Sequence, residues 1–119
     1  IPVLCVAAAR AKGTTLIRDA AELRVKESDR IATMAEVLRA FGVEARELPD
    51  GLEIEGKPTG ALRAATVESK GDHRIAMSAA LLALRGDGPS TIRDVECVAT
   101  SFPGFARTLE DLGASIEEV

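Results

Sequence analysis

An internal repeat is the feature that most constrains the fold of this chain. Residues 13–19 (Gly-Thr-Thr-Leu-Ile-Arg-Asp) match residues 88–94 (Gly-Pro-Ser-Thr-Ile-Arg-Asp). Each copy follows an apolar, alanine-rich run and precedes a helical pattern that ends in glycine and leads into a strand-like segment. Repeats of one supersecondary unit bury their faces against each other. The repeat therefore predicts an α/β fold of the α+β type, with one domain over residues 1–119 and repeat units roughly at 3–47 and 75–118.

Two apolar runs predict helices that are buried on every side. Residues 75–84 are interrupted by Ser78 alone, and residues 3–9 have the same character. A helix that is apolar all round needs neighbours on all of its faces. We therefore expect a helical core surrounded by amphipathic helices and a sheet, with the repeated motif forming strands at Leu16–Ile17 and Thr91–Ile92.

Local signals predict the elements between these runs. Apolar residues recur at helical spacing from Ile31 to Phe41, and Gly42 is expected to end that helix. Alternating residues on either side of Pro49-Asp50-Gly51 predict a hairpin over residues 43–55. A short strand is expected at Ala65–Val67.

The second copy offers its own helix signals. Ser101 is expected to cap a helix that has Pro103 in its first turn. Leu109 and Leu112 are expected on the buried side of this helix. A β-like segment should follow at residues 114–116.

Composition excludes several classes of protein. The chain is 46% hydrophobic and 29% charged with a net charge of −4, which is typical of a globular protein and unfavourable for nucleic-acid binding. It has no Trp or Tyr and three Phe, too few for base stacking. The opening run from Ile1 is too short for a membrane span and lacks signal-peptide flanks, and the chain looks like the interior of a longer protein. The two cysteines have no metal-ligand or redox spacing, and Cys5 is expected in the core. Because unpatterned cysteines are typical of reducing compartments, a cytoplasmic protein is expected.

A charge-rich segment, Leu23-Arg24-Val25-Lys26-Glu27-Ser28-Asp29-Arg30, precedes the expected helix at Ile31. Lys26 and Arg30 are four residues apart and would share a helix face in or beside the first turn. The helix dipole disfavours cations there, whereas an anionic ligand would suit both the free N–H groups and the two cations. The alternative is a solvated helix start in which Glu27 and Asp29 neutralise the cations.

A similar constellation, Asp72-His73-Arg74, begins the second apolar helix. Asp72 is expected to be the N-cap, and Arg74 is again a cation at a helix start. Two such helix starts favour an anion site. His73 could instead make a capping or hydrogen-bonding contact, and Arg74 could instead pair with Asp72 or Glu68 on the surface.

Other chemistries have weak support in the sequence. There is no glycine-rich phosphate loop and no nucleophile elbow, and a single histidine with scattered carboxylates is a poor metal site. Lys26 and Glu27 are the best candidates for proton transfer, because a carboxylate flanked by cations stays ionised.

Three motifs, in this order and at similar separations, resemble the 5-enolpyruvylshikimate-3-phosphate synthase family. They are residues 23–30, Asp72-His73-Arg74-Ile75-Ala76-Met77 and Thr100-Ser101-Phe102-Pro103-Gly104-Phe105. The resemblance covers essentially the whole chain and implies that it is the C-terminal portion of such an enzyme. It also implies repeated βαβαββ units around buried helices, as in one domain of the family's inside-out α/β barrel.

The resemblance further implies a reaction that needs no metal or organic cofactor. The enolpyruvyl group of phosphoenolpyruvate would pass to the 5-hydroxyl of shikimate 3-phosphate with release of phosphate. Lys26 would contact the reacting hydroxyl or phosphate, Glu27 would exchange the proton at C3, and Arg30 and Arg74 would hold the phosphoenolpyruvate carboxylate. Asp72 and His73 would shape the second helix start.

There are departures from the family pattern. Some members carry a lysine that meets phosphate where this chain has Thr100, and the family's catalytic Asp upstream has no match from Ile1 onward. The expected partners are the two substrates and the missing N-terminal part of the same enzyme, and a monomer is expected. The alternatives are an anion-binding structural domain without catalysis, or the related UDP-N-acetylglucosamine enolpyruvyl transferase.

Overall fold

The computed structural model of the protein describes residues 2–101 and 103–116, with the backbone alone for residues 99–101. The parts of the predicted features that fall on Ile1, Phe102 and residues 117–118 lie outside the described residues. The elements follow in the order α1 (Pro2–Ala9), β1 (Thr14–Ile17), η1 (Ala21–Val25, a 3₁₀ helix), α2 (Arg30–Ala40), β2 (Glu44–Leu48), β3 (Gly51–Glu55), β4 (Thr66–Glu68), α3 (His73–Ala83), β5 (Thr91–Arg93), α4 (Glu96–Ser101) and α5 (Phe105–Asp111).

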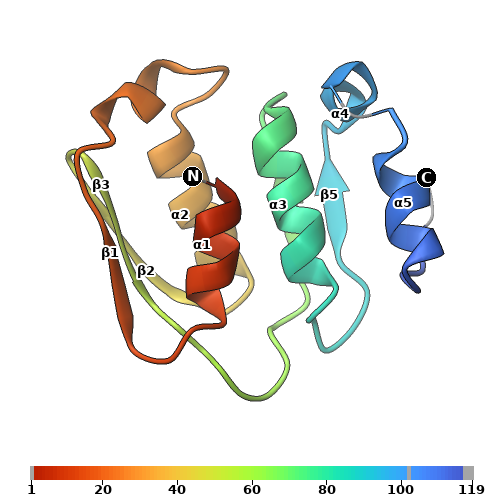
Figure 1. Cartoon of the computed structure of the whole chain (residues 1–119), viewed down its shortest axis with the longest axis horizontal. Coiled ribbons are helices and arrows are strands. Elements are labelled where there is room, and N and C mark those ends of the chain that lie inside the picture. Colours follow the sequence, from red (N-terminus) through yellow and green to blue (C-terminus); the bar gives the residue numbers. More distant parts are fainter. Residues whose placement is uncertain (1, 102, 117–119) are drawn as a thin grey trace.

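The strands form two small sheets, with a group of helices between them (Figure 1). One sheet is antiparallel, in the order β1-β3-β2, and the other pairs β4 with β5 in parallel. The helices α1, α2 and α3 contact one another, and α1 and α2 also contact the first sheet. The expected strands at Leu16–Ile17 and Thr91–Ile92 are confirmed as parts of β1 and β5.

The helix α2 begins and ends at residues with strong capping chemistry. Asp29 is its N-cap, and the side chain accepts a hydrogen bond from the N–H of Ala32 at 3.1 Å. At the other end, Gly42 has a φ of +84° and the N–H of Val43 donates to the carbonyl of Leu38 at 3.0 Å. This left-handed glycine is the stop that the sequence predicts.

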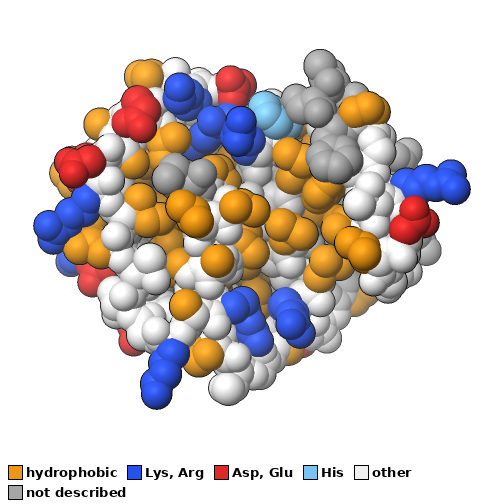
Figure 2. Space-filling model, viewed as in Figure 1, with side chains coloured by type: hydrophobic (Ala, Val, Ile, Leu, Met, Phe, Trp, Pro, Cys, Tyr) orange, Lys and Arg blue, Asp and Glu red, His pale blue; other side chains and the backbone are white. Residues whose placement is uncertain are grey.

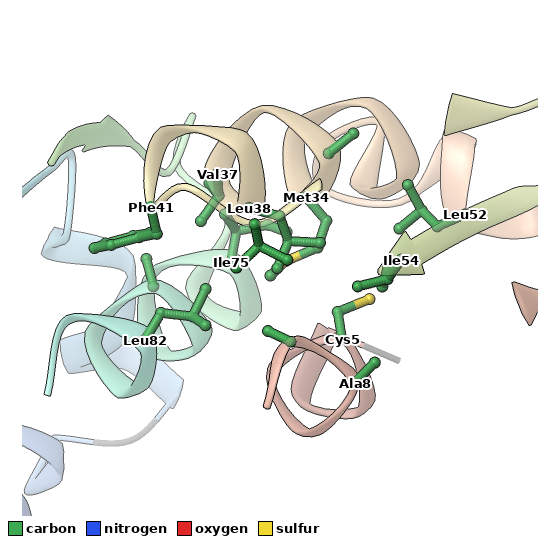
Figure 3. Close-up of a cluster of buried hydrophobic side chains, with 14 of the residues drawn as sticks. Cys5, Ala8, Met34, Val37, Leu38, Phe41, Leu52, Ile54, Ile75 and Leu82 are labelled. Carbon is green, nitrogen blue, oxygen red and sulfur yellow. The ribbon is translucent and has the colours of Figure 1, made fainter. Parts of the chain in front are cut away.

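Burial of one face of α2 builds the core (Figure 3). The core cluster joins side chains from α1, α2, β3 and α3. From α2 it includes Ile31, Met34, Ala35, Val37 and Leu38, with Phe41 just beyond the helix. The other elements contribute Cys5 and Ala8 of α1, Leu52 and Ile54 of β3, and Ile75 and Leu82 of α3. Burial raises the pKa of the Cys5 thiol to about 11, so this thiol is a neutral core group, as expected.

The expectation that the two apolar helices are buried on all sides is wrong. On α1, Val3 and Leu4 are 58% and 55% exposed, and just beyond α3 Leu84 is 49% exposed. Hydrophobic side chains gather over the middle of the face that α1 and α3 present in Figure 2. The physical reason is that no described element packs over this face. Within the described chain, no helix is long and apolar enough to cross a membrane.

The second copy departs from its expected pattern. Ser101 ends α4 instead of capping the next helix, whose N-cap is Gly104 with no side-chain cap. Pro103 lies in the turn between the helices, where a residue with a fixed φ and no N–H is well tolerated. Leu109 is buried as expected, but Leu112 is 80% exposed, because it follows the last turn of α5. Residues 114–116 form no strand.

Both copies share one unusual backbone feature. The motif's aspartates, Asp19 after β1 and Asp94 after β5, have φ values of +56° and +59°. Aspartate tolerates this left-handed region better than most residues with a side chain. The two strands thus end in the same way, whereas the boundaries of the repeat stay a prediction.

Candidate functional site

The two charged motifs lie at the starts of α2 and α3, where each helix is capped by an aspartate. Asp29 caps α2 and Asp72 caps α3, and the Asp72 side chain accepts from the N–H of Arg74 at 3.0 Å. The expectation that Asp72 is an N-cap is therefore confirmed. The Asp72 carboxylate accepts hydrogen bonds from residues of both helix starts, which therefore lie close together.

One buried carboxylate connects the two helix starts. Asp72 is fully buried and faces Arg30, the first residue of α2, which is 6% exposed. The Nε of Arg30 donates to Oδ2 of Asp72 at 2.8 Å, and Nη2 donates to Oδ1 at 3.3 Å. Ser28 adds a hydrogen bond from its hydroxyl to Oδ2 at 2.7 Å. This paired, fully hydrogen-bonded arrangement is what a buried charge requires.

Arg30 also pairs with Glu27, whose side chain is 53% exposed. The remaining nitrogen of Arg30, Nη1, has no partner among the described residues. No fully buried side-chain nitrogen or oxygen in this part of the chain lacks a partner, so Nη1 is not completely enclosed, although the Arg30 side chain as a whole is only 7% exposed. The guanidinium is thus held by two carboxylates, and Nη1 is the nitrogen left for a further contact.

The electrostatics favour ionised carboxylates at both caps. Burial alone would raise the pKa of Asp72, but the hydrogen bonds from Arg30 and Ser28 and the charge of Arg30 outweigh it and lower that pKa. Burial likewise opposes ionisation of Asp29, and the N–H of Ala32 together with Arg24 lowers its pKa. Both groups therefore remain charged at neutral pH.

Lys26 lies elsewhere than the sequence predicts. The expectation that it shares a helix face with Arg30 is wrong, because Asp29 caps α2 and the helix begins only at Arg30. Lys26 has an extended backbone just after η1, and its side chain is exposed. Arg30 is not a free cation either, since Asp72 and Glu27 neutralise it, which is close to the alternative of a neutralised helix start.

Beyond the buried Asp72, the second motif has one side chain that is partly open to solvent and one that is exposed. His73 is half-buried and Arg74 is exposed, and within the described chain the Arg74 side chain pairs with neither Asp72 nor Glu68. Figure 2 shows the histidine beside Lys and Arg side chains at one end of the face. The backbone of Thr100 lies in α4, but its side chain falls outside the description.

Glu27, Asp72 and His73 could in principle hold a metal ion, since one ligand atom from each lies within 4.8 Å of the others. The donor set argues against it. Both oxygens of Asp72 already accept hydrogen bonds, and the Arg30 guanidinium contacts both carboxylates. A cation would have to displace or adjoin that positive charge.

Sequence reasoning gave no role to two groups that build the site, Ser28 and Arg24. Arg24 forms ion pairs with Asp29 and Glu47 and hydrogen bonds with the carbonyls of Leu48 and Pro49. The Asp29 cap could have been recognised, because an aspartate directly before an apolar helical pattern is an N-cap signal. The partners of Arg24 on β2 are more than 20 residues away, so no local pattern reveals them.

Comparison with known proteins matches the sequence of this chain to one family. The family model described as EPSP synthase (3-phosphoshikimate 1-carboxyvinyltransferase) matches residues 1–109. A 3-phosphoshikimate 1-carboxyvinyltransferase of Geobacter sulfurreducens is 60% identical over 109 residues, which cover 92% of this chain and 25% of the relative. One from Synechococcus elongatus is 57% identical over 112 residues, which cover 94% of this chain and 25% of the relative.

The fold agrees with solved structures of the same name. The 2.37 Å structure of EPSP synthase from Acinetobacter baumannii matches with a TM-score of 0.92 and 45% identity, over 98% of this chain and 27% of that one. The chain thus spans about a quarter of the length of the relatives it matches. Its α/β architecture is that of an enolpyruvyl transferase domain, and the chain belongs to the EPSP synthase (3-phosphoshikimate 1-carboxyvinyltransferase) family.

Proposed function

We propose that this chain forms the phosphoenolpyruvate-binding part of a 3-phosphoshikimate 1-carboxyvinyltransferase. In the proposed reaction, the 5-hydroxyl of shikimate 3-phosphate adds to C2 of phosphoenolpyruvate while C3 gains a proton, and the adduct then loses phosphate. The observation that carries the proposal is the Asp72 carboxylate, which holds Arg30 and the start of α3 in one buried cluster. Membership of the family supports it.

The proposed carboxylate site uses two arginines from different helices. Arg30 is fixed by Asp72 with Nη1 left for a further contact, and Arg74 is exposed at the start of α3. Their planar guanidinium groups suit a planar anion such as the phosphoenolpyruvate carboxylate. The free N–H groups of a helix start favour the same charge.

The proposed proton transfer uses the exposed segment before α2. The carboxylate of Glu27 is half exposed and pairs with Arg30, and in this proposal it would exchange the proton at C3. Lys26 would contact the reacting hydroxyl or phosphate. His73 would shape the α3 side of the site, and Thr100 stands where some relatives carry a phosphate-contacting lysine.

The rest of the proposed enzyme would supply what this chain lacks. The remaining part of the same protein would bind shikimate 3-phosphate, and we propose a monomer that needs no cofactor. Two free cysteines, one buried and one half-buried, support a cytoplasmic location.

NMR titration of the chain with phosphoenolpyruvate tests the proposed anion site. Because Arg30 and the N–H groups of α3 meet at Asp72, the amides of residues 26–30 and 72–75 should shift together. Inorganic phosphate and acetate serve as comparison anions. Shifts confined to one segment would contradict a shared site, and equal affinity for all three anions would favour a binding domain without this specificity.

An Arg74→Lys variant of the full-length enzyme tests the role of the guanidinium fork. Lysine keeps the charge but loses the bidentate geometry, so the KM for phosphoenolpyruvate should rise about tenfold while the KM for shikimate 3-phosphate changes little. Arg107→Lys, at an exposed residue of α5, is the matched control. An unchanged phosphoenolpyruvate KM in the Arg74 variant would rule out the proposed contact.

A further inference from the structure

Arg24 forms four side-chain hydrogen bonds, and the proposed function gives it no role that accounts for them. It lies in η1, two residues before Lys26, and its guanidinium reaches the turn of the β2–β3 hairpin. Its Nε donates to the carbonyl of Pro49 at 2.9 Å and its Nη2 to the carbonyl of Leu48 at 2.7 Å. Two backbone carbonyls thus hold one edge of the fork.

The remaining nitrogen of the Arg24 guanidinium, Nη1, contacts Asp29, the N-cap of α2. The Nη1 of Arg24 donates to Oδ2 of Asp29 at 2.9 Å and to Oε1 of Glu47 at 2.6 Å. The second oxygen of Asp29 accepts from the N–H of Ala32. Arg24 is therefore the link that ties the helix cap to the sheet.

The hairpin turn also holds the chain just before Arg24. The N–H of Ala20 donates to the carbonyl of Asp50 at 2.8 Å, and the N–H of Asp19 donates to the Asp50 side chain at 3.0 Å. The segment from Asp19 to Arg24 is thus attached to the hairpin at both of its ends. Residues 26–28 then span from this attachment to Asp29.

We propose that Arg24 is a positioning residue, which holds the segment of Lys26 and Glu27 in place through the Asp29 cap and the hairpin turn. This inference rests on the proposed function for its effect on turnover. Residues 26–28 are anchored on one side by Arg24 and Asp29, and on the other side by Ser28 and Arg30 at Asp72. Arg24 itself touches no proposed substrate.

The two anchors predict a division of kinetic effects. The Arg30 guanidinium is held directly by Asp72, and Arg74 starts α3, whereas Arg24 acts on α2 only through the Asp29 cap, so loss of Arg24 should leave phosphoenolpyruvate binding nearly intact. The position of Glu27 should become less well defined. A displacement of about 1 Å in a reacting group can cost about a hundredfold in rate.

The test is Arg24→Lys, in which one ammonium cannot span the two carbonyls and two carboxylates that the fork reaches. In the full-length enzyme, kcat should fall about tenfold to a hundredfold, while the KM for phosphoenolpyruvate stays within about twofold. In a Glu27→Gln background the same substitution should have little further effect on kcat. Arg46→Lys, at an exposed hairpin residue that pairs with Glu53, is the matched control.

A measurement that needs no catalysis separates this inference from the proposed function. In the 119-residue chain, Arg24→Lys should lower the NMR order parameters of the backbone amides of residues 26–29 from about 0.85, the value of rigid backbone, to below about 0.6, with no comparable change at core residues such as Leu38. Unchanged order parameters at residues 26–29 would overturn the inference whether or not the parent enzyme is active. Inactivity of the parent enzyme would instead count against the proposed function. If the parent enzyme is active, three further outcomes would overturn the inference. They are a kcat of Arg24→Lys within twofold of the parent's, a loss of kcat that persists in the Glu27→Gln background, and an equal loss in Arg46→Lys.

Discussion

At the scale of single residues, the carboxylate of Asp72 serves two purposes at once. It caps α3 through the N–H of Arg74 and neutralises the buried guanidinium of Arg30. A carboxyl group whose pKa is lowered on folding stabilises the folded state above its unfolded pKa, here near 3.8. That contribution is lost as the pH falls through the lower, folded-state pKa. The site's geometry and the protein's acid stability therefore depend on the same side chain.

An Asp72→Asn variant should separate the charge from the cap. Asparagine can still accept from the N–H of Arg74, but Arg30 would keep only Glu27 as a counter-charge. Breaking a buried ion pair on one side costs about 3–5 kcal/mol. Urea unfolding at pH 7 should show that loss, and the difference from the parent should shrink below pH 4. The exposed Asp111→Asn is the control, and a pH-independent difference would refute the linkage argument.

Glu27→Gln tests the proposed proton transfer in the full-length enzyme. Glutamine keeps the shape and the hydrogen bond to Arg30 but cannot exchange a proton at C3. General acid–base groups contribute about a hundredfold to ten-thousandfold, so kcat should fall within that range while both KM values change little. Glu36→Gln, on the exposed side of α2, is the control. Near-normal turnover would move the role to Lys26 or to a group outside this chain.

At the scale of elements, the predictions that succeeded rest on signals within a few residues. Ile31 to Gly42 contains the apolar spacing and the glycine stop of α2, and Pro49-Asp50-Gly51 contains the turn of the hairpin. The predictions that failed needed information from elsewhere. The spacing of Lys26 and Arg30 predicts a shared helix face, but charge spacing does not show where a helix begins. The sequence also predicts Ser101 as an N-cap, whereas the N-cap of α5 is Gly104.

The sequence predicted which residues belong to the candidate site better than it predicted the contacts between them. The sequence indicated Arg30, Asp72 and Arg74 through their places at helix starts. The bond between Arg30 and Asp72 joins residues 42 positions apart, and the Arg24 contacts with β2 and the following turn span 23 to 25 positions. Such contacts depend on how α2, α3 and the hairpin pack, which no local pattern specifies.

The hairpin's attachment to β1 requires a glycine at residue 51. A Cβ there would lie 1.8 Å from the carbonyl oxygen of Ile17, and this backbone atom cannot move aside as a flexible side chain could. Gly51→Ala should therefore lower the free energy of unfolding by an amount at the upper end of about 1–3 kcal/mol. Chemical denaturation measures it, with Gly104→Ala as the control because a Cβ there meets nothing within 4 Å. Equal stabilities of the two variants would contradict the proposed crowding.

At the scale of the whole molecule, the apolar face of α1 and α3 shows that an apolar sequence pattern does not by itself predict burial. Pro2, Cys5 and Ala8 are buried on one side of α1, whereas Val3 and Leu4 are largely exposed on the other. The pattern reports which faces are apolar, and burial depends on which elements are present to cover them. An exposed apolar area of this kind also favours self-association of the chain.

The last prediction concerns the 119-residue chain by itself, which should fold without catalysing the proposed reaction. Folding is expected because one core cluster joins α1, α2, β3 and α3, so thermal unfolding followed by circular dichroism at low concentration should be cooperative. Catalysis is not expected, because much of the barrier is lowered by holding both substrates in line, and this chain would bind phosphoenolpyruvate alone. Millimolar anion affinity, about −4 kcal/mol, should be its limit. Phosphate release from both substrates, measured against an Arg74→Ala variant, decides the matter: turnover above that background would mean that these residues already form a complete site.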